Sequence, residues 1–201
     1  MAPNTIRFSE TLAGRLGPPD QPQAEAGRVG EDTRFLLTVV TPPVERLVAD
    51  PDHRSPAWGC VLAPWLSPEP LGVVRGHLDL FVDGTPDRRV VLMRYRLDLR
   101  TTGDERFVLL GTKELRRRGW FPTVATDATT LRCTLHEGDE RGPLRAHGVL
   151  RQGIVSVLAQ GATFRGSGEW LGLKAILGFF RYYLGALAGV YLRSRPPPTG
   201  S

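Results

Sequence analysis

Cysteine is scarce in this sequence of 201 residues. Cys60 and Cys133 are its two cysteines, and they lie in unrelated segments. A disulfide framework needs several pairs and a structural zinc site needs four ligands, so the sequence excludes both classes. We expect two reduced cysteines in the core. The chain also begins without the basic and apolar regions of a signal peptide, which predicts a cytoplasmic protein.

Familiar catalytic signatures are absent as well. The sequence has no Gly-x-Ser-x-Gly elbow, no Walker loop, no His-x-x-x-His pair and no dinucleotide fingerprint. Its four histidines are dispersed, at His53, His77, His136 and His147. Two of them could face each other across one hairpin, but two ligands without a nearby carboxylate make a poor metal site. We therefore expect neither a metal nor a cofactor.

Charge of one sign is not concentrated anywhere in the chain. The net charge is +5, from 26 basic and 21 acidic residues, and nearly all the basic residues are arginine. This balance weakly favours an anionic partner, but nucleic-acid binding needs a clustered basic stripe, and the one tight run is Arg116–Arg118. The longest charge-free run of the apolar tail, Tyr182–Leu192, is too short for a bilayer. The sequence therefore predicts neither a nucleic-acid partner nor an integral membrane segment.

The clearest structural signal is a group of three strand-like runs: Leu71–Val82, Val90–Arg100 and Arg106–Leu115. In the middle run, apolar residues from Val91 to Leu99 alternate with mostly polar ones, the period of two typical of a strand with one buried face. The connections at 83–87 and 101–104 contain the Gly, Pro, Asp and Thr of hairpin turns. The stretch predicts a three-stranded antiparallel meander.

Further strand-like segments flank the meander, at 5–16, 34–39, 58–65, 129–136, 144–151 and 162–165. Short strands at intervals of roughly 10 to 15 residues favour a barrel or a sandwich over a βαβ fold. We predict a mainly β protein, an antiparallel barrel of eight or nine strands that is calycin- or lipocalin-like. Segment 17–30, rich in Pro and Gly, is interpreted as a mobile loop, and 44–50 as one or two helical turns.

The C-terminal segment has a different hydrophobic pattern from the strand-like segments. Its apolar residues recur at spacings of three and four from Trp170 to Tyr191, which predicts a helix over about 169–192. We expect this helix to pack on the sheet or to close one end of the barrel. Alternatively, it lies on a membrane surface or forms a homodimer contact through Gly185–Gly189. The composition is that of one globular domain, taken as 1–195, followed by a disordered tail at 196–201.

Three polar residues fall on strand faces that are otherwise apolar: Glu10, Tyr95 and Lys113. In a small barrel such faces point inward, where a Lys or Glu without a partner costs roughly several kcal/mol. These residues should therefore pair with each other or with a ligand. One interpretation is a structural Lys–Glu pair near the barrel mouth, or a register that turns Lys113 outward and Glu114 inward. The other is a set of polar anchors in an apolar ligand cavity.

The second interpretation identifies a candidate site. Its catalytic residues are Lys113, Tyr95 and Glu10, and Gly111 leaves room beside Lys113. The residues expected to line the cavity are Met93, Phe8, Phe35, Gly111, Leu109, Trp65 and Cys133.

Several short motifs, taken together, resemble a known bacterial domain. They are Phe8–Gly14, Arg75–Asp83, Met93–Leu97, Gly111–Glu114 and Thr163–Arg165. The set is similar to the small β domain associated with bacterial GMC-type (cholesterol-oxidase-like) oxidoreductases and their α/β-hydrolase relatives. The likeness covers most of the chain in order, but no FAD-binding portion accompanies it. It implies a domain that handles large apolar molecules.

More loosely, the chain resembles the small cofactor-free barrel cyclases of polyketide pathways, including those that close spirotetronate and polyether rings. This likeness implies a cyclase or isomerase, for example for a [4+2] cycloaddition, acting on a large hydrophobic intermediate. Lys113 and Tyr95 would donate to a substrate carbonyl while Glu10 orients one of them. The alternative is a non-catalytic lipid- or sterol-binding module beside a GMC-type oxidoreductase. A third hypothesis is an interaction protein that uses helix 169–192.

Overall fold

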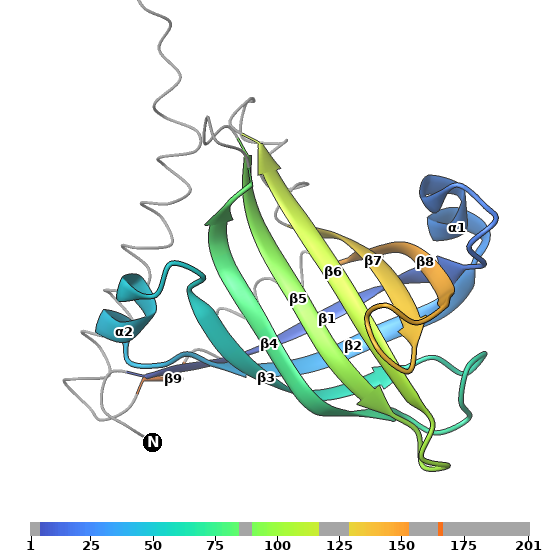
Figure 1. Cartoon of the computed structure of the whole chain (residues 1–201), viewed down its shortest axis with the longest axis horizontal. Coiled ribbons are helices and arrows are strands. Elements are labelled where there is room, and N and C mark those ends of the chain that lie inside the picture. Colours follow the sequence, from blue (N-terminus) through green and yellow to red (C-terminus); the bar gives the residue numbers. More distant parts are fainter. Residues whose placement is uncertain (1–4, 85–89, 117–128, 153–164, 167–201) are drawn as a thin grey trace, which may run out of the picture.

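The strands form a closed antiparallel barrel. The structure is a computed structural model that describes residues 5–84, 90–116, 129–152 and 165–166. The barrel strands are β1 (Ile6–Gly17), β2 (Glu31–Val40), β3 (Arg54–Leu62), β4 (Leu71–Asp83), β5 (Val90–Arg100), β6 (Arg106–Arg116), β7 (Thr130–Glu137) and β8 (Leu144–Arg151). Each strand pairs with the next one along the chain, and β8 pairs back with β1. Figure 1 shows β4 to β6 crossing in front of β1 and β2, as the tilt of barrel strands requires.

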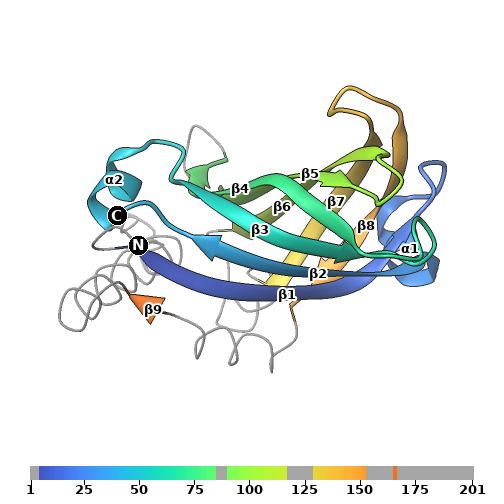
Figure 2. The ribbon, with the colours of Figure 1, turned by 90° about the horizontal axis from the view of Figure 1, so that it is seen from below.

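The predicted mainly β barrel is therefore confirmed, with eight strands in the closed wall. A ninth, β9 (Arg165–Gly166), pairs with the start of β1 (Figure 2). The predicted helical turns at 44–50 correspond to α2 (Val44–Ala49). The predicted helix 169–192 and the predicted tail 196–201 lie outside the described residues.

One strand is displaced from its predicted position. The sequence predicted a strand at 58–65, whereas β3 begins at Arg54 and ends at Leu62. It ends there because the chain turns at Ala63, whose carbonyl oxygen accepts hydrogen bonds from the backbone N–H groups of Leu66 (2.8 Å) and Ser67 (3.0 Å). Pro64 thus lies in a turn rather than in the sheet.

The interpretation of 17–30 as a mobile loop is wrong. The segment contains α1 (Gln23–Val29), and the side chain of Ala26 is fully buried. Two hydrogen bonds tie the segment to the outside of the barrel: Gln23 Nε2 donates to the carbonyl oxygen of Cys133 (3.1 Å), and His147 Nε2 donates to that of Gln21 (2.6 Å). The helix is therefore packed against the barrel wall.

Apolar side chains line the interior of the barrel. Along β5 the burial alternates strictly from Val91 to Leu99, which confirms the period-two prediction. The fully buried side chains include at least one from most of the strands: Leu12, Phe35, Leu78, Leu97, Leu109, Leu131 and Leu150. Each such burial stabilises the fold by about 1.5–3 kcal/mol. The alternation is what turns residues 10, 95 and 113 to the inside.

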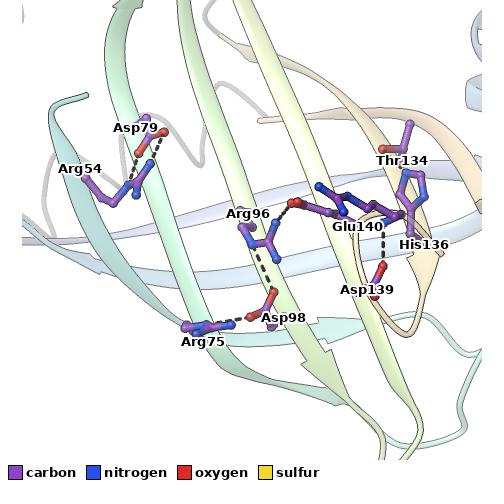
Figure 3. Close-up of polar contacts among 10 residues, drawn as sticks. Arg54, Arg75, Asp79, Arg96, Asp98, Thr134, His136, Asp139 and Glu140 are labelled. Atoms are coloured by element: carbon purple, nitrogen blue, oxygen red, sulfur yellow. Dashed lines mark hydrogen bonds and ion pairs between the residues drawn. The ribbon is translucent and has the colours of Figure 1, made fainter. Parts of the chain in front are cut away.

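The outer face over β3 to β5 carries a network of ion pairs (Figure 3). Arg54 binds both carboxylate oxygens of Asp79, at 2.7 and 3.1 Å. Further along the wall, Asp98 lies between Arg75 (2.8 Å) and Arg96 (3.5 Å). The Arg54–Asp79 pair is the stronger element because its contact is bidentate and the Asp79 side chain is only 9% exposed. Arg54, Arg75 and Arg96 thus each have a carboxylate partner.

Candidate functional site

Glu10, Tyr95 and Lys113 meet inside the barrel, although they come from β1, β5 and β6. The Lys113 ammonium contacts Oε1 of Glu10. The Tyr95 hydroxyl donates to the same carboxylate, 3.2 Å from Oε1 and 3.0 Å from Oε2. Lys113 Nζ also lies 5.2 Å from the centre of the Tyr95 ring, within the range of a cation–π contact. We call these three residues the inner polar cluster.

The strand register explains how the inner polar cluster forms. Met93 of β5 lies opposite Lys113 of β6, and Tyr95 lies opposite Gly111, so Tyr95 and Lys113 are diagonal neighbours on one face. Closure of the sheet through β8 and β1 then brings Glu10, 103 positions away in the sequence, against Lys113. A sheet that stayed open would not make this contact.

Burial makes the cluster energetically demanding. The side chains of Lys113 and Glu10 are 2% and 3% exposed. Each charge loses most of its hydration at such a site, and the pair is tolerated because each charge has a close partner of opposite sign. The alternative register, with Lys113 outside and Glu114 inside, is wrong, since Lys113 is buried and Glu114 is half-buried.

The ammonium group has hydrogen-bonding capacity to spare. A lysine carries three N–H donors. Within the described residues, Glu10 is the one acceptor to which Lys113 donates. Buried polar groups normally have partners, so this cation is suited to receive an acceptor atom from a bound molecule.

Cys133 lies on the inner face beside the cluster but is not a nucleophile. Its Sγ donates to the carbonyl oxygen of Leu131 at 3.8 Å. Burial raises the pKa of the Cys133 thiol far above its ordinary value, and the nearby charge of Lys113 offsets only part of that rise. The thiol therefore stays protonated and packs as a small apolar group.

Most of the residues predicted to line a cavity lie in the same core. These are Phe8, Phe35, Met93, Leu109, Gly111 and Cys133, all of them buried. Trp65 is the exception, because the turn after β3 places it at one end of the barrel. There its indole Nε1 donates to the hydroxyl of Thr33 (3.1 Å), and Thr33 pairs with Gly14, four residues along β1 from Glu10. The structure does not bring Trp65 to the inner polar cluster.

Three surface pockets of about 610, 580 and 470 Å³ lie on the described part of the molecule. None of the three is lined by a residue of the inner polar cluster, so a ligand cavity inside the barrel stays a prediction. The second pocket gathers Arg28, Arg132 and Arg151, which sequence reasoning did not single out.

Two further properties concern only the described residues. No group of three or more His, Cys, Asp or Glu side chains there could hold a metal ion. Neither of the helices found there, which have seven and six residues, is long and apolar enough to cross a membrane.

Comparison with known proteins adds no relative: no family model matches the chain, and neither the curated proteins nor the solved structures include a match.

Proposed function

We propose that the protein binds an apolar small molecule inside its barrel and closes a ring in that molecule without a cofactor. The observation that supports this best is the buried ammonium of Lys113, which has donors to spare and is surrounded by apolar side chains. Eight-stranded barrels such as the lipocalins are just wide enough to enclose one small ligand. A calycin-like use of the interior would suit this architecture.

The proposed chemistry needs only positioning and polarisation. In a [4+2] ring closure two π bonds are consumed and two σ bonds form, so no atom, proton or electron enters or leaves. The barrel would hold the reacting ends of a flexible substrate together. Lys113 would donate a hydrogen bond to a carbonyl conjugated with the reacting double bond and stabilise the charge that develops on its oxygen.

Glu10 and Tyr95 have supporting roles in this proposal. The carboxylate of Glu10 is the ion-pair partner of Lys113 in an apolar interior, and the Tyr95 hydroxyl fixes that carboxylate through both of its oxygens. The substrate class that fits is a large hydrophobic intermediate of polyketide type with one polar end. The resemblance to the barrel cyclases and to the GMC-associated domain favours the same class.

The second candidate is a non-catalytic lipid- or sterol-binding module that works beside a GMC-type oxidoreductase. One observation favours it: Tyr95 and Lys113 both engage the carboxylate of Glu10, so the cluster is already paired without a reacting group, and the remaining donors of Lys113 can hold a polar group. A cluster of this kind can hold the polar end of an apolar ligand without changing it.

The test uses the wild-type protein, the double variant Lys113→Met/Glu10→Gln, and a control, Thr112→Val. The double variant removes both inner charges, whereas Thr112 is the neighbour of Lys113 on the opposite face of β6. Each protein is incubated with an apolar metabolite extract of the organism that makes it and then separated from the extract. Mass spectrometry measures conversion and retention, and fluorescence of Nile red, a neutral dye with a carbonyl group, measures binding.

A product of unchanged mass that forms with wild type and Thr112→Val, but not with the double variant, would support ring closure. Retention of an unchanged metabolite together with Nile red binding would instead support the binding module and refute the cyclase. Absence of both conversion and binding would refute both candidates.

A further inference from the structure

The second surface pocket is a groove between α1 and the barrel wall. One side is formed by Gln23, Ala24, Gly27 and Arg28 of α1, and the other by the neighbouring strands β7 and β8. Its volume of about 580 Å³ is within the range of small-molecule sites. We call it the arginine groove, because its lining among the described residues includes three arginines and no acidic residue: Arg28, Arg132 and Arg151.

The strand register places two of these arginines next to each other. Arg132 of β7 pairs with Val149 of β8, and Thr130 pairs with Arg151, so the two arginines are diagonal neighbours. Their side chains are exposed, as is that of Arg28, which reaches the groove from the last turn of α1. Like charges at this spacing repel one another, so the arrangement costs stability unless an anion binds.

None of the three arginines has a carboxylate partner among the described residues. By contrast, Arg54, Arg75 and Arg96, which Figure 3 shows, are all paired with acidic side chains. The groove also includes Thr130, whose hydroxyl oxygen is buried without a hydrogen-bond partner. Unpaired cations and an unsatisfied hydroxyl together are typical of a site for an anion.

The shape of the groove is fixed by close packing. Small residues, Ala13, Gly14, Ala24 and Gly27, form part of its lining and leave the arginines accessible. At Gly27 an added Cβ would lie 3.0 Å from the Cβ of Val149, so the helix lies directly on β8. Gln23, hydrogen-bonded to β7, holds the other end of the helix. The three arginines therefore project from a helix and two strands that are packed against one another.

We propose that the arginine groove binds the phosphate group of a small molecule. A single carboxylate would neutralise one of three guanidinium groups, whereas a phosphate or pyrophosphate carries two or more charges and matches the planar donor pairs of arginine. This site is on the outside of the barrel and does not depend on ring closure in the interior. The phosphate can come from a soluble molecule or from a lipid headgroup.

Calorimetric titration of the full chain with inorganic phosphate and with pyrophosphate, in low-salt buffer, tests whether the groove binds the phosphate of a soluble molecule. Co-sedimentation with phosphatidylcholine vesicles, with and without phosphatidic acid, tests the headgroup. The variants are Arg132→Gln and Arg151→Gln. Arg94→Gln is the matched control, because Arg94 is exposed, lines none of the three pockets and lies in the same cross-strand row as Arg132, two strands away.

We expect saturable binding of pyrophosphate that is weakened about tenfold or more by Arg132→Gln or Arg151→Gln and by no more than about twofold by Arg94→Gln. Binding to phosphatidic acid vesicles alone, with the same pattern among variants, would support the proposal with a lipid source. Amide NMR signals of Gly14 and Gly27 should shift on binding, which gives a readout in wild type if a variant is unstable. Absence of saturable binding to every probe, or equal weakening by all three substitutions, would overturn the proposal.

Discussion

Replacing Lys113 by Met should destabilise the fold strongly. The substitution keeps the length of the side chain but removes the ammonium from a site where it is 2% exposed, and it leaves Glu10, 3% exposed, without its counter-ion. Breaking a buried ion pair by removing one partner costs about 3–5 kcal/mol. For a chain of this size that corresponds to a fall in Tm of about 6–20 °C.

The double variant Lys113→Met/Glu10→Gln should recover most of this loss, because neither charge then remains in the apolar interior. Urea unfolding followed by tryptophan fluorescence gives the free energy of unfolding, and thermal unfolding followed by circular dichroism gives Tm. The reasoning would be refuted if the single variant stayed within about 1 kcal/mol of wild type, since exposed pairs contribute that little. A double variant whose loss of unfolding free energy equals the sum of the two single losses would also refute it, because residues in contact are expected to show non-additive losses.

Three further predictions concern other parts of the barrel. Ellman's reagent at about pH 8 should find one fast thiol in the native protein, the half-buried Cys60, since burial raises the pKa of the Cys133 thiol; two fast thiols would contradict this. Gly14→Ala should lower the free energy of unfolding by about 1–3 kcal/mol, because its Cβ would lie 2.2 Å from the carbonyl oxygen of Val149 at the closure of the barrel; an unchanged urea midpoint would argue against that closure. Burial lowers the pKa of His77 below the ordinary 6.5, so the unfolded chain binds this proton more tightly. Stability should therefore fall as pH drops below 6.5 towards the folded pKa and be unaffected by His77 at higher pH. His77→Gln should remove that loss, and an NMR titration midpoint at or above 6.5 would show the sign to be wrong.

The sequence predicts the inner polar cluster better than it predicts the helix and the groove on the outside of the barrel. Period-two alternation places Glu10, Tyr95 and Lys113 on inner faces, and the structure confirms all three placements. Alternation cannot give the contact between Glu10 and Lys113, because that contact depends on how β8 closes on β1. The face of a residue is a local property, whereas its partner is set by the register of the whole barrel.

The composition around α1 explains why the sequence does not predict this helix. Residues 17–22 carry Gly and three prolines, a composition that predicts a loop for the entire segment. The available signal is the boundary pattern: Pro22 precedes the helix and Gly30 follows it, with Glu25 in its first turn and Arg28 in its last. Because the helix was missed, so was the arginine groove, which needs both α1 and the register of β7 with β8.

The most direct test of the inner polar cluster is the NMR signal of its ammonium group. The chain has two lysines, Lys113 and Lys174, so protein labelled with side-chain 15N-lysine gives two ammonium signals, and Lys174→Arg assigns them. We expect the Lys113 signal to be protected from exchange with water and to shift as Nile red is added to saturation of its fluorescence. A Lys113 signal broadened by fast exchange with water, or one that does not move when the dye is bound, would contradict a buried cation that receives the polar end of an apolar ligand.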